Sequence, residues 1–281
     1  MIRALFLILL SSLSVVLASC EKDEHAAVDV GLLSTDIHVS VGQHALVLPF
    51  IAMDDYAYRP PSFSLDRKRD SEQARSALRQ FLHDSADPEK PLALDGFSVT
   101  VRTYGWYGEL TSSSRICPLL TRNWARSVCD NPWAAIRQAL PEDRFRLVDL
   151  SRLQVEDPHG PVNCRDDGKP RRPLPQKPGE AVMVCDGGHD DQVHRAVIRI
   201  DGDLGALWTV WRYGQNGETA EAMTEREGKA IAAFVHYALG KSENFSDLHA
   251  AMCRLRRPGS SDGPHGADDN PRGADCERAA N

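Results

Sequence analysis

Apolar residues follow two different spacings in this 281-residue chain, one typical of strands and one typical of helices, and each spacing occupies its own blocks of sequence. This separation limits the possible folds more than any other feature. Alternating apolar residues predict strands that come in adjacent groups. Apolar residues spaced three and four apart predict helices between those groups. Strands that are neighbours along the chain pair most simply as antiparallel hairpins. The sequence therefore predicts an α+β fold with a mainly antiparallel sheet, packed helices and supporting disulfides.

Glycines and prolines indicate where several elements begin and end. Residues 35–53 are expected to form a β-hairpin, because Gly42 can adopt the positive φ of a tight turn. The clearest helix is expected over residues 221–239, with Gly240 just beyond its end. The same patterns predict further helices at 70–83, 118–128, after Pro132 and at 245–255, and strands at 97–107, 146–155, 181–185, 193–201 and 206–213.

Composition changes suggest how the chain is divided. Residues 31–258 are expected to form a single α+β domain. Residues 157–180 contain six prolines, so they are either a break between two subdomains or a long surface loop. Residues 259–281 are polar and glycine-rich, and we expect a mobile tail there.

The first twenty residues have the pattern of an export segment. Arg3 precedes an apolar run from Ala4 to Val16, which would reach only about 20 Å as a helix, short of the ~30 Å bilayer core. Leu17-Ala18-Ser19-Cys20 follows and resembles the lipobox of bacterial lipoprotein precursors. The resemblance implies that residues 1–19 are a removable signal peptide and that Cys20 carries lipid.

The same resemblance implies a location in the bacterial cell envelope. Residues 20–30 would be the lipidated cysteine and a short stalk, with the body facing the periplasm. Two or more acyl chains anchor a protein stably to a membrane, whereas one does so only marginally. The residue after the cysteine is Glu21, not Asp, and in enterobacterial lipoproteins this favours the outer membrane.

The net charge of the chain limits which classes of partner it can bind. The formal charge is −7, and removal of residues 1–19 with Arg3 leaves −8. An acidic chain lacks the Lys/Arg surface that a phosphate backbone needs, so no nucleic-acid partner is expected. A negative body can instead steer towards a basic protein.

Six cysteines remain after Cys20, and an even number in an oxidising compartment predicts up to three disulfides. Neighbour pairing is the simplest of fifteen connectivities. The pair Cys117–Cys129 would need a broken or shortened helix between its cysteines. The ends of a straight 118–128 helix lie roughly 18 Å apart, whereas a disulfide needs its two Cα atoms within about 7 Å. The candidates are Cys117, Cys129, Cys164, Cys185, Cys253 and Cys276.

The segment 186–194 is the most enzyme-like part of the chain. His189, Asp190 and His194 are weak candidates for metal ligands, but their spacing does not place two histidines on one helix face. The glycines and flanking strands favour a polar hairpin loop instead. No nucleophile or phosphate-loop motif is present, so no catalytic residue and no cofactor are expected.

Three polar residues of the predicted 221–239 helix could be mistaken for a site. Glu225 and Glu227 are expected to point to different faces as solvated charges, which disfavours a paired-carboxylate mechanism. His236 is expected to be a partly buried residue at the edge of the core.

Two aromatic stretches are candidates for a partner-binding surface. Strands place successive side chains on opposite faces, so one face of each stretch should be core and the other can be exposed. Trp, Tyr and Arg dominate the energetics of many interfaces. The candidates are Tyr104, Trp106, Tyr107, Trp208, Trp211, Arg212 and Tyr213.

Three functions fit these features. The favoured one is a membrane-tethered, non-enzymatic protein-binding lipoprotein. In layout it resembles the immunity lipoproteins that bacteria use against secreted toxin effectors. The alternatives are a metal-dependent envelope hydrolase that uses His189 and His194, and an envelope assembly or ligand-binding lipoprotein.

Overall fold

The computed structural model describes residues 30–54, 67–101, 116–130, 135–141, 144–153, 173–185, 193–211, 217–257 and 276. Within these residues the chain is α+β with two mainly antiparallel sheets, as the sequence predicts. The first half contributes α2 (Val30–Ser34), β1 (Asp36–Val41), β2 (His44–Pro49), η2 (Phe50–Ala52), β3 (Met53–Asp54), α3 (Arg67–Asp84), β4 (Leu92–Leu94), β5 (Gly96–Val99), η5 (Cys117–Leu119), α5 (Asn123–Asp130) and α6 (Ala135–Ala139). The second half contributes β6 (Phe145–Asp149), β7 (Ala181–Cys185), β8 (Val193–Asp201), β9 (Leu204–Trp211), α7 (Ala220–Ala238) and α8 (Phe245–Arg254).

The smaller sheet has the strand order β2-β1-β4. Strands β1 and β2 form the predicted antiparallel hairpin, and Gly42 in its turn has a φ of 56°. Strand β4 pairs with β1 in parallel. Four consecutive residues of β2 are buried, which matches a strand that is apolar on both faces.

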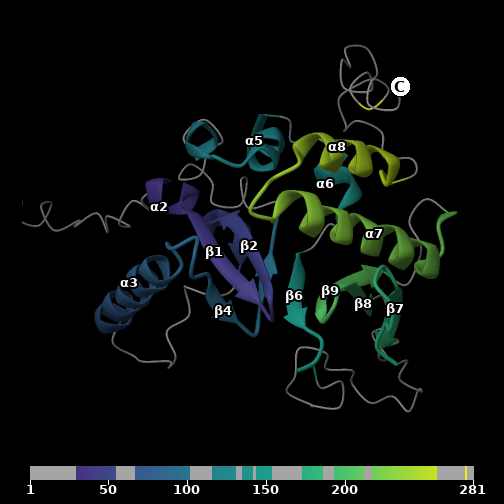
Figure 1. Cartoon of the computed structure of the whole chain (residues 1–281), viewed down its shortest axis with the longest axis horizontal. Helices are drawn as coiled ribbons and strands as arrows, with labels where there is room; N and C mark the ends of the chain where they lie inside the picture. The colour runs from purple at the N-terminus through teal and green to yellow at the C-terminus, as the bar shows by residue number, and fades with distance from the viewer. Residues whose placement is uncertain are drawn as a thin grey trace, which may run out of the picture.

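The larger sheet has the order β3-β5-β6-β9-β8-β7, and every pairing in it is antiparallel. Helix α7 packs against β7, β8 and β9, while α6 and α8 pack against α7 (Figure 1). The sheet is therefore covered by helices on one face. Val148, Val197 and Leu207 lie in a second, smaller apolar cluster, apart from the cluster that α7 shares with the sheet.

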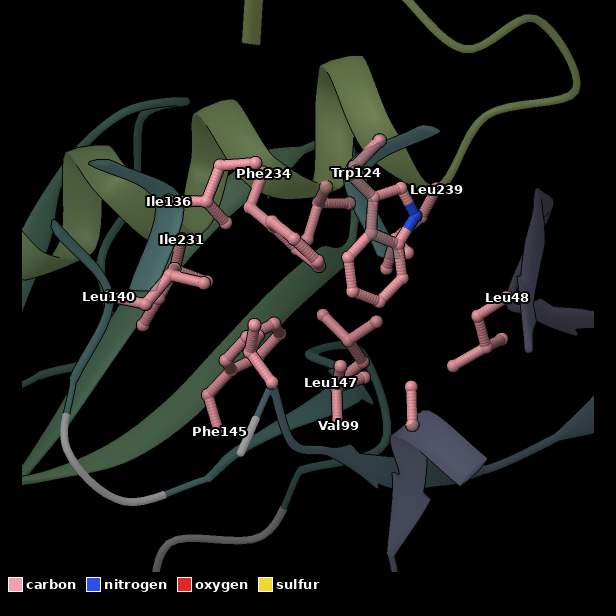
Figure 2. Packing of buried hydrophobic residues seen from close by; sticks show 14 of the residues in the cluster. Leu48, Val99, Trp124, Ile136, Leu140, Phe145, Leu147, Ile231, Phe234 and Leu239 are labelled. Carbon is pink, nitrogen blue, oxygen red and sulfur yellow. The ribbon is translucent and has the colours of Figure 1, made fainter. Parts of the chain in front are cut away.

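One continuous apolar core joins both sheets to the helices. At its centre the rings of Trp124 and Phe234 meet edge to face, with centroids 4.9 Å apart, and Phe145 contacts Phe234 in the same way (Figure 2). Edge-to-face pairs place positive ring edges on negative ring faces. Leu48 from the small sheet belongs to the same cluster, so strands far apart in sequence share one core.

Helix α7 shows why its sequence boundaries were predictable. Thr219 caps its first turn, because the Thr219 side chain accepts a hydrogen bond from the Ala222 backbone N–H. The helix ends at Ala238, one residue from the predicted end. Arg122 donates to the carbonyls of Ala238 and Gly240, which places a positive charge at the negative end of the helix.

The predicted helix over residues 118–128 is wrong as a single element. The chain forms the short turn η5, leaves the helical path at Leu120, and starts α5 at Asn123. Glu243 stabilises this second start, since its carboxylate accepts the backbone N–H groups of Asn123 and Trp124. The sequence requires such a break for any disulfide between Cys117 and Cys129.

Two predicted strands are shorter than expected within the described residues. Strand β5 ends at Val99, and β6 ends at Asp149. A turn follows β6, in which the Asp149 carboxylate accepts hydrogen bonds from the Ser151 backbone and hydroxyl. Side-chain bonds of this kind give the backbone an alternative to the sheet ladder.

Candidate functional site

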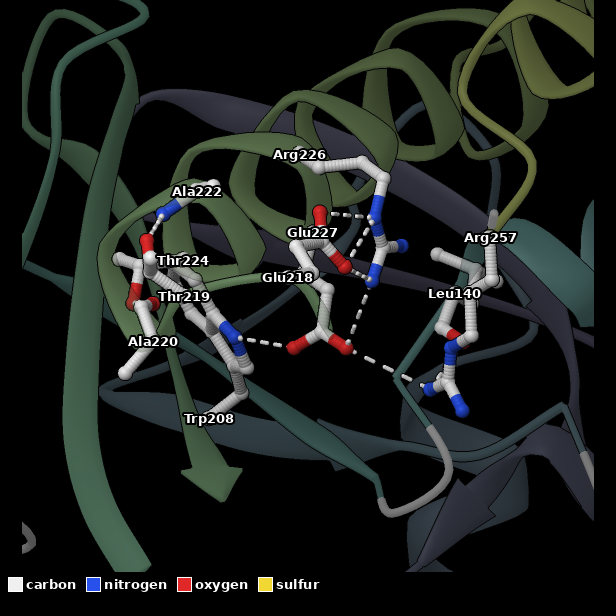
Figure 3. A network of polar contacts seen from close by, with 10 residues as sticks. All are labelled: Leu140, Trp208, Glu218, Thr219, Ala220, Ala222, Thr224, Arg226, Glu227 and Arg257. Atoms are coloured by element: carbon white, nitrogen blue, oxygen red, sulfur yellow. Dashed lines mark hydrogen bonds and ion pairs between the residues drawn. The ribbon is translucent and has the colours of Figure 1, made fainter. Parts of the chain in front are cut away.

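Helix α7 carries a buried carboxylate, that of Glu227, at the centre of a network of polar contacts (Figure 3). Glu227 is 3% exposed, whereas the sequence predicted a solvated charge. The prediction was wrong because position 227 lies four residues after Met223 and four before Ile231. All three positions therefore share the buried face of the helix. That spacing is the signal that could have identified Glu227.

A glycine next in the chain brings this helix unusually close to the sheet. A Cβ at Gly228 would lie 2.8 Å from the Cβ of Ala181 and 3.2 Å from the ring of Trp208. Only a residue without a side chain fits there. The close approach lets a side chain of β9 reach the carboxylate of Glu227.

Three side chains from different parts of the chain converge on Glu227. The indole Nε1 of Trp208 donates to Oε2 at 3.1 Å. Arg257, which follows α8, places Nη2 3.4 Å from Oε1, and Arg226 places Nη2 3.6 Å from the same oxygen. Arg257 also donates to the backbone carbonyl of Leu140, so the network joins α7, β9, the residue after α6 and the segment after α8.

A second carboxylate completes the network. Glu218 accepts two parallel bonds from Arg226, with Nε to Oε1 at 2.9 Å and Nη2 to Oε2 at 3.1 Å. Bidentate pairs of this kind are among the stronger charged hydrogen bonds. With Arg257 and Glu227 included, the cluster contains two positive and two negative groups.

Burial raises the pKa of Glu227 from 4.5 to about 6, and the charge of Glu218 adds to the rise. Arg257, Arg226 and the hydrogen bond from Trp208 act in the opposite direction without cancelling it. The cost of removing the carboxylate from water therefore exceeds the gain from its cationic neighbours.

The arrangement suits a structural role better than a chemical one. A raised pKa is common in catalytic carboxylates. However, a carboxylate that is 3% exposed and enclosed by a helix, a strand and two guanidinium groups offers no room for a substrate as the fold stands. Glu227 is therefore a polar tie that fixes α7 relative to the sheet and to the segment after α8.

The hypothesis of a metal site at His189, Asp190 and His194 stays a prediction. His189 and Asp190 lie outside the described residues, and His194 is a strand residue of β8 that is 8% exposed. A different trio, His249, Cys253 and Cys276, has its potential ligand atoms within 4.8 Å of one another. Its two sulfur atoms are bonded to each other, so no thiolate is present to bind a metal.

The disulfide prediction is confirmed for one pair. Cys253 and Cys276 are bonded, with a Cα–Cα distance of 5.4 Å. Cys117 is also in a disulfide. The side chains of Cys129, Cys164 and Cys185 are outside what the structure describes, as is Cys20.

The aromatic candidates divide into two groups. Trp208 is 2% exposed and packs under α7, so it belongs to the core and is not available to a partner. The prediction that Trp208 belongs to a binding surface is thus wrong, because its side chain points to the face that α7 covers. The remaining candidates lie outside the described residues or have undescribed side chains: Tyr104, Trp106, Tyr107, Trp211, Arg212 and Tyr213.

His236 also differs from expectation. Its side chain is exposed and meets the ring of Tyr237 at a centroid distance of 4.6 Å. Position 236 is next to the buried Val235, so one step of about 100° along the helix carries it out of the core.

Comparisons with known proteins give no similarity to build on: no family model, characterised protein or solved structure matches this chain. Among the residues that the structure describes, none of the helices is long and apolar enough to cross a bilayer.

Proposed function

We propose that this protein is a lipid-anchored protein of the bacterial cell envelope that binds a protein partner without catalysis. Its most specific role would be that of an immunity protein against a secreted toxin effector. The observation that carries the proposal is the segment Leu17-Ala18-Ser19-Cys20 directly after an apolar run too short to span a bilayer. A lipid on Cys20 would hold the folded body at the membrane where such a toxin acts.

The disulfide between Cys253 and Cys276 supports an exported location. Disulfides persist in oxidising compartments such as the bacterial periplasm and are rare in the reducing cytosol. This bond joins residues 23 apart in sequence and attaches Cys276 to helix α8. Such a bond is of structural use only where it stays oxidised.

The polar cluster around Glu227 fits a fold without catalysis at this carboxylate. The carboxylate with the raised pKa is enclosed and bonded to Trp208 and Arg257, so it faces other side chains of the chain and not a substrate. The negative charge of the chain suits a basic partner, because charge complementarity speeds association. The candidates that remain for contact with that partner are Tyr104, Trp106, Tyr107, Trp211, Arg212 and Tyr213.

The anchor is tested by mass spectrometry of the full chain made in a bacterial host. We expect the wild type to begin at Cys20 and to carry acyl chains. Cys20→Ser should abolish the lipid, whereas Ser19→Ala is the matched control, because a small residue stays before the cysteine. A wild-type chain with its start methionine and no lipid would overturn the proposed location.

The immunity role is tested by growth of bacteria that produce the chain together with a secreted toxin encoded beside its gene. Wild-type protein and Ser19→Ala should protect, and Cys20→Ser should protect less. Trp106→Ala and Tyr107→Ala should weaken binding of the purified toxin. Absence of protection by a correctly lipidated chain would overturn the immunity role and leave the anchor intact.

A further inference from the structure

Two large apolar side chains stand out on the surface of the described residues. Leu32 in α2 is 38% exposed, and Leu119 in η5 is 49% exposed. Each has a buried leucine beside it, Leu33 and Leu120, that anchors its turn in the core. The exposed leucines therefore project from well-anchored turns.

The two turns lie on the same side of the molecule. Elements α2 and η5 contact each other, and η5 in turn contacts α5, which follows it (Figure 1). A hydrogen bond fixes the arrangement, because the Thr121 hydroxyl donates to the Asp36 carboxylate at 2.5 Å. Asp36 and Thr121 each follow one of the exposed leucines closely in sequence.

A positive group is held next to the turn that carries Leu119. Arg126 is exposed on α5, and its Nε donates to the carbonyl of Leu120, the residue next to Leu119. Apolar side chains flanked by a guanidinium are suited to the boundary between acyl chains and anionic headgroups.

This side of the fold is also the one with the shortest covalent path to Cys20. Helix α2 starts at Val30, ten residues after Cys20. Ten residues span at most roughly 35 Å when fully extended. A lipid on Cys20 would thus keep α2 within that distance of the membrane surface.

We propose that Leu32, Leu119 and Arg126 form a membrane-contact face that rests on the lipid surface holding Cys20. The proposal rests on lipidation of Cys20, as in the proposed function. In that orientation strand β1 runs away from the membrane, since α2 precedes Asp36 at one end of the strand. The turns at 42–43 and 201–203 lie at the other end, where His44 approaches Gly202.

The test uses the lipidated full chain in vesicles of phosphatidylethanolamine and phosphatidylglycerol that contain a lipid with a photoreactive diazirine in its acyl chain. After illumination, peptide mass spectrometry locates the lipid adducts, and intact mass reports the lipid on Cys20. We expect adducts on peptides that contain Leu32 and Leu119, and none on the turn at 201–203.

A double variant, Leu32→Ser/Leu119→Ser, should lose these adducts while keeping the lipid on Cys20 and its far-ultraviolet circular dichroism spectrum. The matched control is Gln43→Ser in the distant β1–β2 turn, which should leave the labelling unchanged. Because wild-type labelling is measured first, the test does not depend on the folding of the variant.

The outcomes separate the two proposals. A chain without lipid on Cys20 overturns the proposed function and this inference with it. A lipidated chain with adducts only elsewhere overturns the membrane-contact face alone. Loss of partner binding in the double variant, with no adducts on the wild-type leucines, would assign the surface to a protein and also overturn the inference.

Discussion

The indole N–H of Trp208 in β9 donates to the carboxylate of Glu227 in α7 at 3.1 Å, inside the core. The two residues are 19 positions apart, and one hydrogen bond joins the sheet to its covering helix. A buried carboxylate is stable there only because a Trp donor and two arginines partly replace water. Three predictions test this network and the packing around it, and a fourth tests the disulfide that starts from α8.

Glu227 should give stability a pH dependence with a definite sign. Its pKa is about 6 in the folded chain and 4.5 as the reference, so between these values the folded state binds more protons. Protonation of Glu227 therefore contributes to the free energy of unfolding fully below pH 4.5, and this contribution is lost as the pH rises through 6. The change is about 2 kcal/mol. Urea unfolding of wild type and Glu227→Gln at pH 4–7 measures it.

The variant Glu227→Gln stays uncharged, so the wild type should lose stability relative to it with rising pH. Glu225→Gln is the matched control on the same helix. The hydrogen bond from Lys229 lowers the pKa of Glu225. The ionised Glu225 therefore adds to the stability of the fold above its unfolded pKa, and this addition is lost as the pH falls, which is the opposite sign to Glu227. Equal pH slopes for wild type and Glu227→Gln would contradict the burial argument.

Replacing Trp208 by Phe should remove a donor from the buried carboxylate while keeping an aromatic ring. We expect the free energy of unfolding to fall by about 1–3 kcal/mol and the pKa of Glu227 to rise further, because the lost hydrogen bond favoured the charged form. Carbon-detected NMR titration of the Glu227 side chain measures the pKa. An unchanged pKa would show that the Trp208 contact has no electrostatic effect.

Gly228→Ala should destabilise the protein although alanine is the better helix former. The new Cβ would lie 2.8 Å from the Ala181 Cβ, so α7 must move off the sheet, at a cost of about 1–3 kcal/mol. Helix propensity returns at most about 1 kcal/mol. Thermal unfolding compares it with Lys229→Ala, an exposed neighbour. A Gly228→Ala melting temperature above that of wild type would disprove the close packing.

Removal of the Cys253–Cys276 bond should lower stability by about 3 kcal/mol, since a loop of 23 residues regains its freedom in the unfolded chain. Cys253→Ala, Cys276→Ala and the double variant should lose similar amounts, because each change breaks the same bond. Guanidinium unfolding under non-reducing conditions measures this. Additive losses in the double variant would indicate that the two residues act independently.

The sequence alone determined the elements whose signals are local. Gly42 supplied a turn conformation that other residues rarely adopt, and residues 221–239 combined a continuous apolar stripe with Gly240 just beyond its end. Such signals act over a few residues, so they survive without knowledge of the rest of the chain. The α+β class follows from them, because strands and helices occur in separate blocks.

Only the tertiary structure decided which polar side chains are buried. Glu227 is enclosed because Arg257, thirty residues later, and Trp208 on a strand both reach it. The break before α5 likewise depends on Glu243, which is 120 residues beyond Asn123. Local periodicity contains no information on contacts at such separations. They exist only once the packed core has brought the segments together and removed water from between them.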